Sequence, residues 1–232
     1  MVSVEIDRVS KSYGAVQALR DVSLSVGRGE LFGLIGPDGA GKTTLFRLLA
    51  TLILPDSGSA RIDGLDCVGD YRKIRHRVGY MPGRFSLYPD LSVEENLQFF
   101  ASLFSTTIQE NYELVAPIYR QIEPFRKRYA RNLSGGMKQK LALCCALIHK
   151  PSVLLLDEPT TGVDVVSRVE FWDMLASLRG QGITIVASTP YTDEARRCDR
   201  IALLHEGRLL GIRNPDGFND EIFIRLMHGQ NH

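Results

Sequence analysis

The sequence predicts an α/β fold with a mainly parallel sheet, an N-terminal antiparallel β subdomain and a helical insertion subdomain. Three observations support this prediction. Short apolar runs alternate with stretches of helical periodicity, the N-terminal segment alternates apolar and polar residues, and from about 89 to 150 the apolar residues fall at helical spacing. We expect a single domain over residues 1–232, with an α/β core at about 1–88 and 151–232 and the helical subdomain at about 89–150.

Composition sets the class of protein. The 232 residues suffice for one large α/β domain, and the net charge of +1 gives no electrostatic reason to expect nucleic acid as a partner. No apolar run approaches the ~20 residues that span a bilayer, and the first residues predict a strand rather than a signal peptide. A cytoplasmic location is therefore expected. The cysteines show no metal-ligand spacing, and Cys144 and Cys145 are expected to be small buried apolar residues of a helix.

The first half of the predicted core consists of strands around one helix. Residues 2–9 and 22–26 alternate apolar and polar positions, as half-buried strands do. The continuous apolar run at 31–35 predicts a strand buried on both faces, and leucines up to Leu52 predict a helix over 42–52. Shorter strands are expected at 58–62 and 78–81.

The first helix of the insertion is predicted to begin at Ser92, because Glu95 three residues later completes a capping box. Another helix is expected over 134–148. The chain then returns to core elements, and a hairpin turning at Glu206 and Gly207 closes it. These later elements are strands at 153–158 and 183–188, a helix at 165–178, and hairpin strands at 201–204 and 208–212.

The stretch from Gly36 to Thr43 fits the pattern G-x-x-x-x-G-K-[ST] at every fixed position. It stands between a predicted strand and a predicted helix, where loop and helix N–H groups can hold phosphate. Lys42 would supply charge for the β- and γ-phosphates, and the Thr43 hydroxyl would be a Mg²⁺ ligand. The residues expected to contact the nucleotide here are Gly36, Pro37, Asp38, Gly39, Ala40, Gly41, Lys42, Thr43 and Thr44.

Two carboxylates end the predicted strand at 153–158. Asp157 can hold Mg²⁺ directly or through water, and Glu158 can polarise an attacking water as general base. The alternative interpretation is a pair of exposed acids that merely close a strand.

A glycine-rich turn at 133–137 (Leu-Ser-Gly-Gly-Met) precedes the helix over 134–148. With this turn, nearly the whole chain, from about 4 to 210, resembles the ATP-binding subunit of ABC transporters. Residues 36–43 match the Walker A motif of that family, 154–158 its Walker B motif, and 133–137 its signature motif. The stretch that ends at Asp164 is similar to the family's D-loop, and Tyr13 stands where the family has an aromatic residue that stacks on adenine.

The resemblance implies a P-loop NTPase core that binds ATP and Mg²⁺ and hydrolyses ATP. It also implies a head-to-tail dimer with a second ABC ATP-binding subunit or half, and a transmembrane permease subunit as partner. Each ATP would lie between Walker A of one subunit and the signature motif of the other. The chain would then be peripheral on the cytoplasmic face of the membrane. The signature residues expected at the partner's γ-phosphate are Ser134, Gly135 and Gly136, and Asp164 and Tyr13 complete the nucleotide contacts.

The segment from about 80 to 97 is similar to the exporter branch, in which the membrane domain is a separate chain. Phe85, Leu87 and Tyr88 are candidates for contact with that membrane subunit. Packing inside the helical subdomain is the alternative interpretation of these three residues.

Two positions depart from the family pattern. Gly83 stands in place of the Q-loop glutamine, and Pro190 in place of the switch histidine. Neither residue has a polar side chain for the γ-phosphate side of the site. We therefore expect slow hydrolysis at this chain's own site and an intact signature for a partner's site, in a dimer that is asymmetric. A homodimer in which Glu158 alone suffices for slow turnover is the alternative.

Other functions remain open at the level of sequence. A soluble ABC-type ATPase or ATP-dependent regulator could act on nucleic acid or ribosomes. A catalytically weak protein could also bind ATP only to change conformation.

Overall fold

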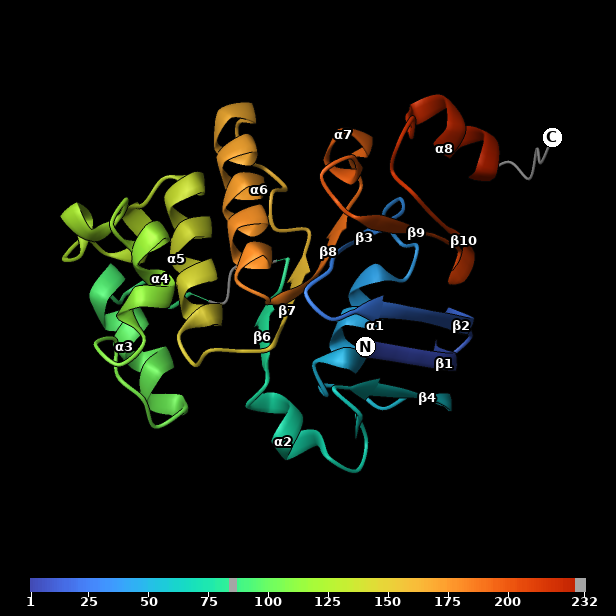
Figure 1. Ribbon diagram of the computed structural model, residues 1–232, viewed down its shortest axis with the longest axis horizontal. Coiled ribbons are helices and arrows are strands. Elements are labelled where there is room, and N and C mark those ends of the chain that lie inside the picture. The colour runs from blue at the N-terminus through green and yellow to red at the C-terminus, as the bar shows by residue number, and fades with distance from the viewer. Residues whose placement is uncertain (84–86, 228–232) are drawn as a thin grey trace.

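The computed structural model describes residues 1–83 and 87–227. Its strands form two sheets, a four-stranded sheet of order β2-β1-β4-β5 and a six-stranded sheet of order β10-β9-β3-β8-β7-β6 (Figure 1). The strands are β1 (Val2–Tyr13), β2 (Val16–Gly27), β3 (Leu31–Ile35), β4 (Ser57–Ile62), β5 (Leu65–Asp66), β6 (Val78–Met81), β7 (Val153–Asp157), β8 (Thr184–Thr189), β9 (Arg200–His205) and β10 (Arg208–Arg213).

The pairing directions confirm the predicted α/β fold class. All pairs of the first sheet are antiparallel, whereas β3, β6, β7, β8 and β9 pair in parallel and only the β9–β10 hairpin is antiparallel. The α-helices are α1 (Lys42–Leu49), α2 (Tyr71–Arg75), α3 (Val93–Leu103), α4 (Tyr112–Tyr119), α5 (Gly135–Leu147), α6 (Val165–Gly180), α7 (Thr192–Ala195) and α8 (Asp220–Met227).

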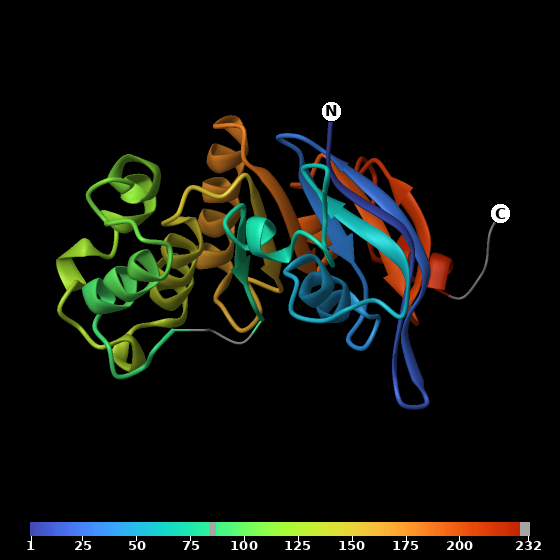
Figure 2. The same ribbon diagram turned by 90° about the horizontal axis from the view of Figure 1, so that it is seen from below.

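The core lies on both faces of the six-stranded sheet. Alternate residues of β7 point to opposite faces, so Leu154 and Leu156 belong to the cluster around α5 and α6, whereas Val153 and Leu155 belong to the cluster around α1. Figures 1 and 2 show α1 between the two sheets, and the insertion helices α3 and α4 packed beside α5 at the far end of the molecule. Cys144 and Cys145 are buried, as predicted.

The predicted helix over 42–52 is too long. α1 ends at Leu49, because Thr51 has a φ of 59° and its N–H bonds to the carbonyl of Leu48, while the N–H of Leu52 bonds to that of Arg47. These two bonds form a Schellman motif, which ends a helix. Leu52 therefore leaves the apolar face and is 55% exposed.

Other boundaries also differ from the prediction. β1 and β2 extend to a hairpin tip, so Tyr13 is the last residue of β1 rather than a residue beyond the first strand. Figure 2 shows this hairpin projecting from the body of the molecule. The short elements β5, α2 and α7 and the terminal helix α8 had no predicted counterpart. Within the described residues, none of the helices combines the length and the apolar character needed to cross a membrane.

The capping box that opens α3 is confirmed. Oγ of Ser92 accepts the Glu95 N–H at 3.2 Å, and the Glu95 carboxylate accepts the Ser92 N–H at 2.7 Å. This reciprocal pair fixes the start of the insertion helices beside the core.

Candidate functional site

The loop between β3 and α1 packs so closely against its neighbours that two of its positions require glycine. Gly41 has a φ of 106°, and a Cβ there would lie 2.4 Å from the carbonyl oxygen of Ala18. A Cβ on Gly36 would lie 2.2 Å from the carbonyl oxygen of Leu204. Only glycine fits at either position, so β2 and β9 pack directly against the loop and fix its path.

Lys42 turns into the centre of this loop. Its side chain is 3% exposed, and Nζ donates hydrogen bonds to the carbonyls of Gly36 at 2.7 Å and Pro37 at 2.9 Å. The same nitrogen lies 3.0 Å from Oε1 of Glu158. The lysine of the Walker A motif and the last carboxylate of the Walker B motif thus meet, although they are far apart in the sequence.

Asp157 is buried at the end of β7, beside Thr43. Its Oδ1 accepts a hydrogen bond from Oγ of Ser188 at 2.9 Å, and its carboxylate also bonds to the Thr43 hydroxyl. Burial raises the pKa of Asp157 above its ordinary value, against these two hydrogen bonds. A carboxylate beside a hydroxyl is an oxygen donor pair of the kind that Mg²⁺ prefers, so these residues fit the predicted metal.

Glu158 follows in an unusual backbone conformation. Its φ is 49°, which is uncommon for a residue other than glycine and is typical of functional sites. The Glu158 N–H donates to Oγ of Ser188 at 2.9 Å, and the Thr161 hydroxyl donates to Glu158 Oε2 at 3.3 Å. These contacts hold the half-buried carboxylate on the side of Lys42.

A cavity of about 520 Å³ opens beside the two carboxylates. Gly83 lines it, and a Cβ on Gly83 would lie 3.1 Å from the carbonyl oxygen of Asp157, so the predicted Q-loop position does lie next to Asp157. Burial, together with the charge of Asp157, raises the pKa of Tyr80 in this cavity to about 12. The lining residues are Thr43, Arg47, Leu52, Tyr80, Pro82, Gly83, Asp157 and Glu158.

Sequence reasoning missed Tyr80 and Arg47. Tyr80 pairs with Leu155 across β6 and β7, which brings its ring close to Asp157. Arg47 lies in the last turn of α1 and bonds to the Tyr80 hydroxyl. Tyr80 could have been found as a residue on the strand next to that of the Walker B motif. The sequence alone, however, did not give the order of the strands in the sheet.

The signature residues lie outside this cavity. Oγ of Ser134 accepts the Met137 N–H at 3.3 Å and caps α5, with Ser134 and Gly135 exposed. A Cβ on Gly136 would lie 2.8 Å from Oγ of Ser167, so the signature turn packs on the start of α6. The signature turn is thus an exposed helix N-terminus, and its contact with a partner's nucleotide stays a prediction.

Two other predicted nucleotide contacts lie apart from the cavity as well. Oδ1 of Asp164 accepts the Ser167 N–H at 2.9 Å and caps α6. Tyr13 is 46% exposed at the hairpin tip, with Nζ of Lys11 5.9 Å from its ring centre. Both side chains are accessible, and their contact with nucleotide stays a prediction.

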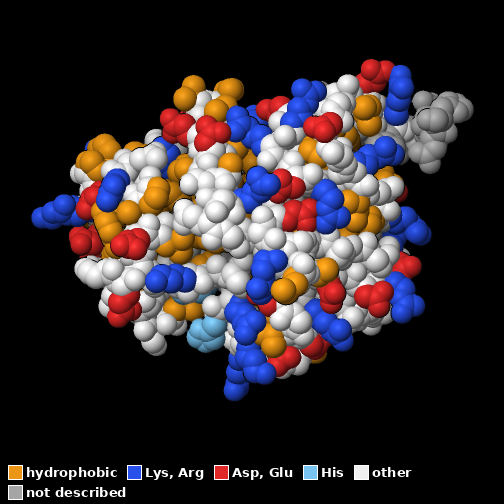
Figure 3. Space-filling view, viewed as in Figure 1, with side chains coloured by type: hydrophobic (Ala, Val, Ile, Leu, Met, Phe, Trp, Pro, Cys, Tyr) orange, Lys and Arg blue, Asp and Glu red, His pale blue; other side chains and the backbone are white. Residues whose placement is uncertain are grey.

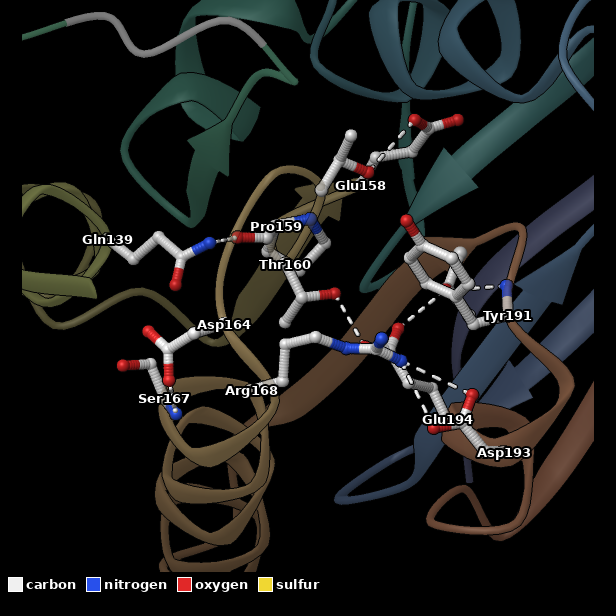
Figure 4. Close-up of polar contacts among 12 residues, drawn as sticks. Gln139, Glu158, Pro159, Thr160, Asp164, Ser167, Arg168, Tyr191, Asp193 and Glu194 are labelled. Carbon is white, nitrogen blue, oxygen red and sulfur yellow. Dashed lines mark hydrogen bonds and ion pairs between the residues drawn. The ribbon is translucent and has the colours of Figure 1, made fainter. Parts of the chain in front are cut away.

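The loop after β8 is held by a buried carboxylate that the sequence did not reveal. Glu194 of α7 is 2% exposed and accepts hydrogen bonds from the hydroxyls of Thr160 and Thr189 and from Arg168 (Figure 4). Pro190, at the predicted switch position, lies in the same loop.

The three candidates for membrane-subunit contact have different outcomes. Phe85 lies outside the described residues. Leu87 is half-buried and packs on the core cluster, whereas Tyr88 is 45% exposed, with its ring centre 4.6 Å from that of Phe99. Leu87 thus agrees with the alternative of packing inside the protein, whereas Tyr88 is accessible at the surface for contact with a membrane subunit.

Known proteins share both the sequence and the fold. The family model described as ABC transporter matches residues 19–161. The probable multidrug ABC transporter ATP-binding protein YbhF of Escherichia coli (strain K12) is 47% identical over 195 residues, which cover 83% of this chain and 34% of that protein. The Nod factor export ATP-binding protein I of Paraburkholderia xenovorans (strain LB400) is 40% identical over 216 residues, which cover 92% of this chain and 71% of that protein.

The chain thus spans about a third of the length of the first of these relatives. A solved dimeric ATP-binding cassette in a post-hydrolysis state with ADP and Pi superposes with a TM-score of 0.83 at 26% identity, covering 93% of this chain and 100% of that one. An ATP-binding subunit of an ABC transporter superposes with a TM-score of 0.86 at 29% identity, covering 97% and 99%. This chain belongs to the ABC transporter family, as one of its ATP-binding cassettes.

Proposed function

We propose that the chain binds ATP with Mg²⁺ and couples its slow hydrolysis to export through a separate membrane subunit. The observation that carries the proposal is that Lys42, Thr43, Asp157 and Glu158 lie together at one edge of the six-stranded sheet. At this edge β3 and β7, which flank β8, both reach their carboxyl ends. In open parallel sheets, ligands bind at this edge. The named relatives are export or multidrug proteins, which favours export as the direction.

Each residue has a distinct task in this proposal. Lys42 binds the β- and γ-phosphates after leaving Glu158, and Glu158 then accepts the proton of the attacking water. Thr43 and Asp157 would hold Mg²⁺, which would neutralise the negative charge that develops on the phosphates. The cavity beside Asp157 leaves room for the terminal phosphate and that water.

Dimerisation is the second part of the proposal. The exposed N-terminus of α5, with Ser134 and Gly135, is suited to a phosphate held by a partner, because helix N–H groups and the helix dipole favour an anion. One of the solved relatives is described as dimeric in its ADP and Pi state. We propose a head-to-tail dimer with a second ABC ATP-binding subunit or half, in which Asp164 lies close to the shared interface.

Slow hydrolysis follows from Gly83 and Pro190. Gly83 offers no side chain beside Asp157, and Pro190 offers no donor in the loop after β8. Loss of one preorganised donor to developing charge costs about 10²–10³ in rate. The signature turn has no such loss, so the dimer is asymmetric: this chain keeps ATP as a clamp while its partner hydrolyses.

The membrane partner is proposed to dock at a groove between the core and the insertion helices. This groove has a volume of about 570 Å³, with Leu52 and Leu103 exposed at its rim and Phe104 stacked on His149 at a ring distance of 3.8 Å. Arg72 and Arg75 of α2 border it, and Figure 3 shows Lys and Arg side chains gathered over α2 beside a histidine. The fitting occupant is a short amphipathic helix of the permease with an acidic residue.

The first experiment measures MgATP uptake by calorimetry, with Lys42→Ala as the matched blank. We expect saturable binding that Lys42→Ala abolishes, and steady-state phosphate release far below tens of turnovers per second. Fast turnover by the isolated chain, abolished by Glu158→Gln, would contradict the clamp, and no uptake at all would contradict the site.

The second experiment measures co-purification with membranes that contain a candidate permease. Charge reversal at Arg75 should reduce it, whereas charge reversal at Arg128, an exposed cation of the insertion, should not. Retention by ribosomes, released by nuclease, would instead favour the alternative of a regulator that acts on nucleic acid.

A further inference from the structure

We propose that Glu194, held in place by Arg168, is a positioning residue for Glu158 in its proposed role as general base. Its single buried carboxylate ties Thr160, in the loop before α6, to Thr189, at the end of β8, and each lies next to a residue that bonds to the acidic pair. The inference rests on the proposed ATPase function, and it concerns residues that do not touch the nucleotide.

The carboxylate of Glu194 has three partners from three elements. Oε1 accepts the Thr160 hydroxyl at 2.7 Å and Nε of Arg168 at 2.9 Å, and Oε2 accepts the Thr189 hydroxyl (Figure 4). Glu194 is 2% exposed, and Thr160 and Thr189 are buried as well. Hydrogen bonds to a buried charge are stronger than neutral ones, so this junction is stiff.

On one side the junction leads to the carboxylate of Glu158. Thr160 is directly followed by Thr161, whose hydroxyl donates to Glu158 Oε2 at 3.3 Å. If Thr160 is released from Glu194, the turn that carries Thr161 loses its buried anchor. The proposed general base then loses a fixed orientation relative to Lys42.

On the other side the junction leads to Asp157. Thr189 directly follows Ser188, whose hydroxyl donates to Asp157 Oδ1 and accepts the Glu158 N–H, both at 2.9 Å. Glu194 therefore bonds to the chain neighbours of Thr161 and Ser188, the two residues whose hydroxyls contact the acidic pair.

Arg168 extends the tie to the loop that contains Pro190. Its guanidinium lies 4.2 Å from the ring centre of Tyr191 and also contacts the Asp193 carboxylate at 3.1 Å. The Tyr191 N–H donates to the Thr189 hydroxyl at 3.1 Å. Pro190 has no side-chain hydrogen bond to fix this loop, so its position depends on the neighbours that Arg168 and Glu194 hold.

The decisive variant is Thr160→Val, which keeps the shape of the side chain and removes one hydroxyl from Glu194. The matched control is Asp173→Asn. It breaks the ion pair with Arg197 at 2.7 Å, which joins α6 to the segment after α7 without touching either loop. Amide hydrogen exchange of residues 158–164 and 188–191 is measured without nucleotide, followed by MgATP affinity and turnover.

For Thr160→Val we expect exchange in both loops to quicken about tenfold, because a local hydrogen bond sets their opening. Turnover should fall about tenfold with MgATP affinity within about twofold, the signature of an interaction needed in the transition state. Asp173→Asn should match the wild type in all three measurements.

Trp172, the single tryptophan of the chain, provides a spectroscopic check. It is 1% exposed on α6 and lines a small cavity with Arg168, Asp193 and Glu194. Arg168→Ala should shift the emission of Trp172 and reproduce the turnover loss, and Arg168→Lys should restore part of the turnover.

A double-mutant comparison tests whether the two hydrogen-bonding partners act together. The double variant Thr160→Val/Glu194→Gln should lose less free energy of activation than the sum of the losses in its two single variants.

The outcomes separate the two proposals. Wild-type exchange and turnover in both Thr160→Val and Glu194→Gln would overturn the positioning role while leaving the ATPase function intact. Equal losses in Thr160→Val and Asp173→Asn would also overturn it, because they would indicate general loosening of α6. Absence of MgATP uptake by the wild type would instead refute the proposed function, with the exchange data still deciding whether Glu194 ties the loops.

Discussion

Nζ of Lys42 lies 3.0 Å from Oε1 of Glu158, so the proposed phosphate-binding cation is paired with the proposed general base. Two loop carbonyls complete the coordination of the ammonium group. In the proposed function, an incoming triphosphate would displace Glu158 from Lys42. The displaced carboxylate would then be free to accept a proton from water.

The first prediction concerns this competition. Glu158→Gln removes the anion that competes with phosphate for Lys42, so MgATP affinity should rise by up to about fivefold, as expected for a partly exposed ion pair. Turnover should fall by about 10²–10⁴ because the base is lost. Calorimetry and phosphate release measure the two effects separately.

Glu206→Gln is the control for this prediction, since Glu206 lies in the β9–β10 turn. It should change neither quantity. Weaker nucleotide binding by Glu158→Gln would show that the pair does not compete with the triphosphate.

The second prediction concerns the missing donor at position 190. Pro190→His should raise turnover at least about tenfold, because it restores a side-chain donor in the loop after β8. Pro190→Ala frees the backbone in the same way but adds no donor, so it should give no gain. Equal rates for the two variants would mean that something other than a donor limits hydrolysis. Phosphate release at saturating ATP is the measurement.

The third prediction is a trade between stability and metal binding at Asp157. Burial raises the pKa of Asp157, so the folded state holds its proton more tightly than the unfolded state. The stability that the group contributes is complete below its unfolded pKa and is lost as pH rises through the folded pKa. Asp157→Asn should therefore raise Tm by a few degrees at neutral pH, with the difference shrinking as pH falls, and should abolish Mg²⁺-dependent nucleotide binding.

Asp56 gives a comparison of opposite sign. A hydrogen bond from Lys11 lowers the pKa of Asp56, so its contribution to stability is present above its unfolded pKa and is lost as pH falls through the folded pKa. Asp56→Asn should not raise Tm at neutral pH. Melting curves from about pH 4 to 8 test both variants, and a lower Tm for Asp157→Asn at pH 7 would contradict the prediction.

The phosphate loop and the acidic pair could be predicted because their chemistry is carried by consecutive residues. Gly36 to Thr43 must follow a strand and open a helix, and the structure confirms both neighbours. Likewise, Asp157 ends a continuous apolar run, which marks the end of a buried strand. In each case a few consecutive residues were enough to predict the position of the functional groups at the end of a strand.

The contacts of Glu194 could not be predicted in the same way. Its hydroxyl partner Thr160 is 34 positions away, and α7 spans only four residues, which is too short to show a helical period. Tyr80 was missed for a similar reason, since its place beside Asp157 depends on the pairing of β6 with β7. The exposure of Leu52 depended on a Schellman motif with a non-glycine residue, Thr51, at its left-handed position.

The last prediction separates two roles of Asp164. Its carboxylate caps α6 through the Ser167 N–H, and asparagine caps a helix about as well as aspartate whereas alanine does not. In nucleotide-free protein, Asp164→Ala should therefore lower Tm by about 2–4 °C and Asp164→Asn should leave it unchanged. Equal melting temperatures for the two variants would exclude the cap as a source of stability. With stability matched in this way, any loss of turnover in the Asp164→Asn dimer reports the carboxylate's contribution at the partner's nucleotide, because the cap itself is preserved.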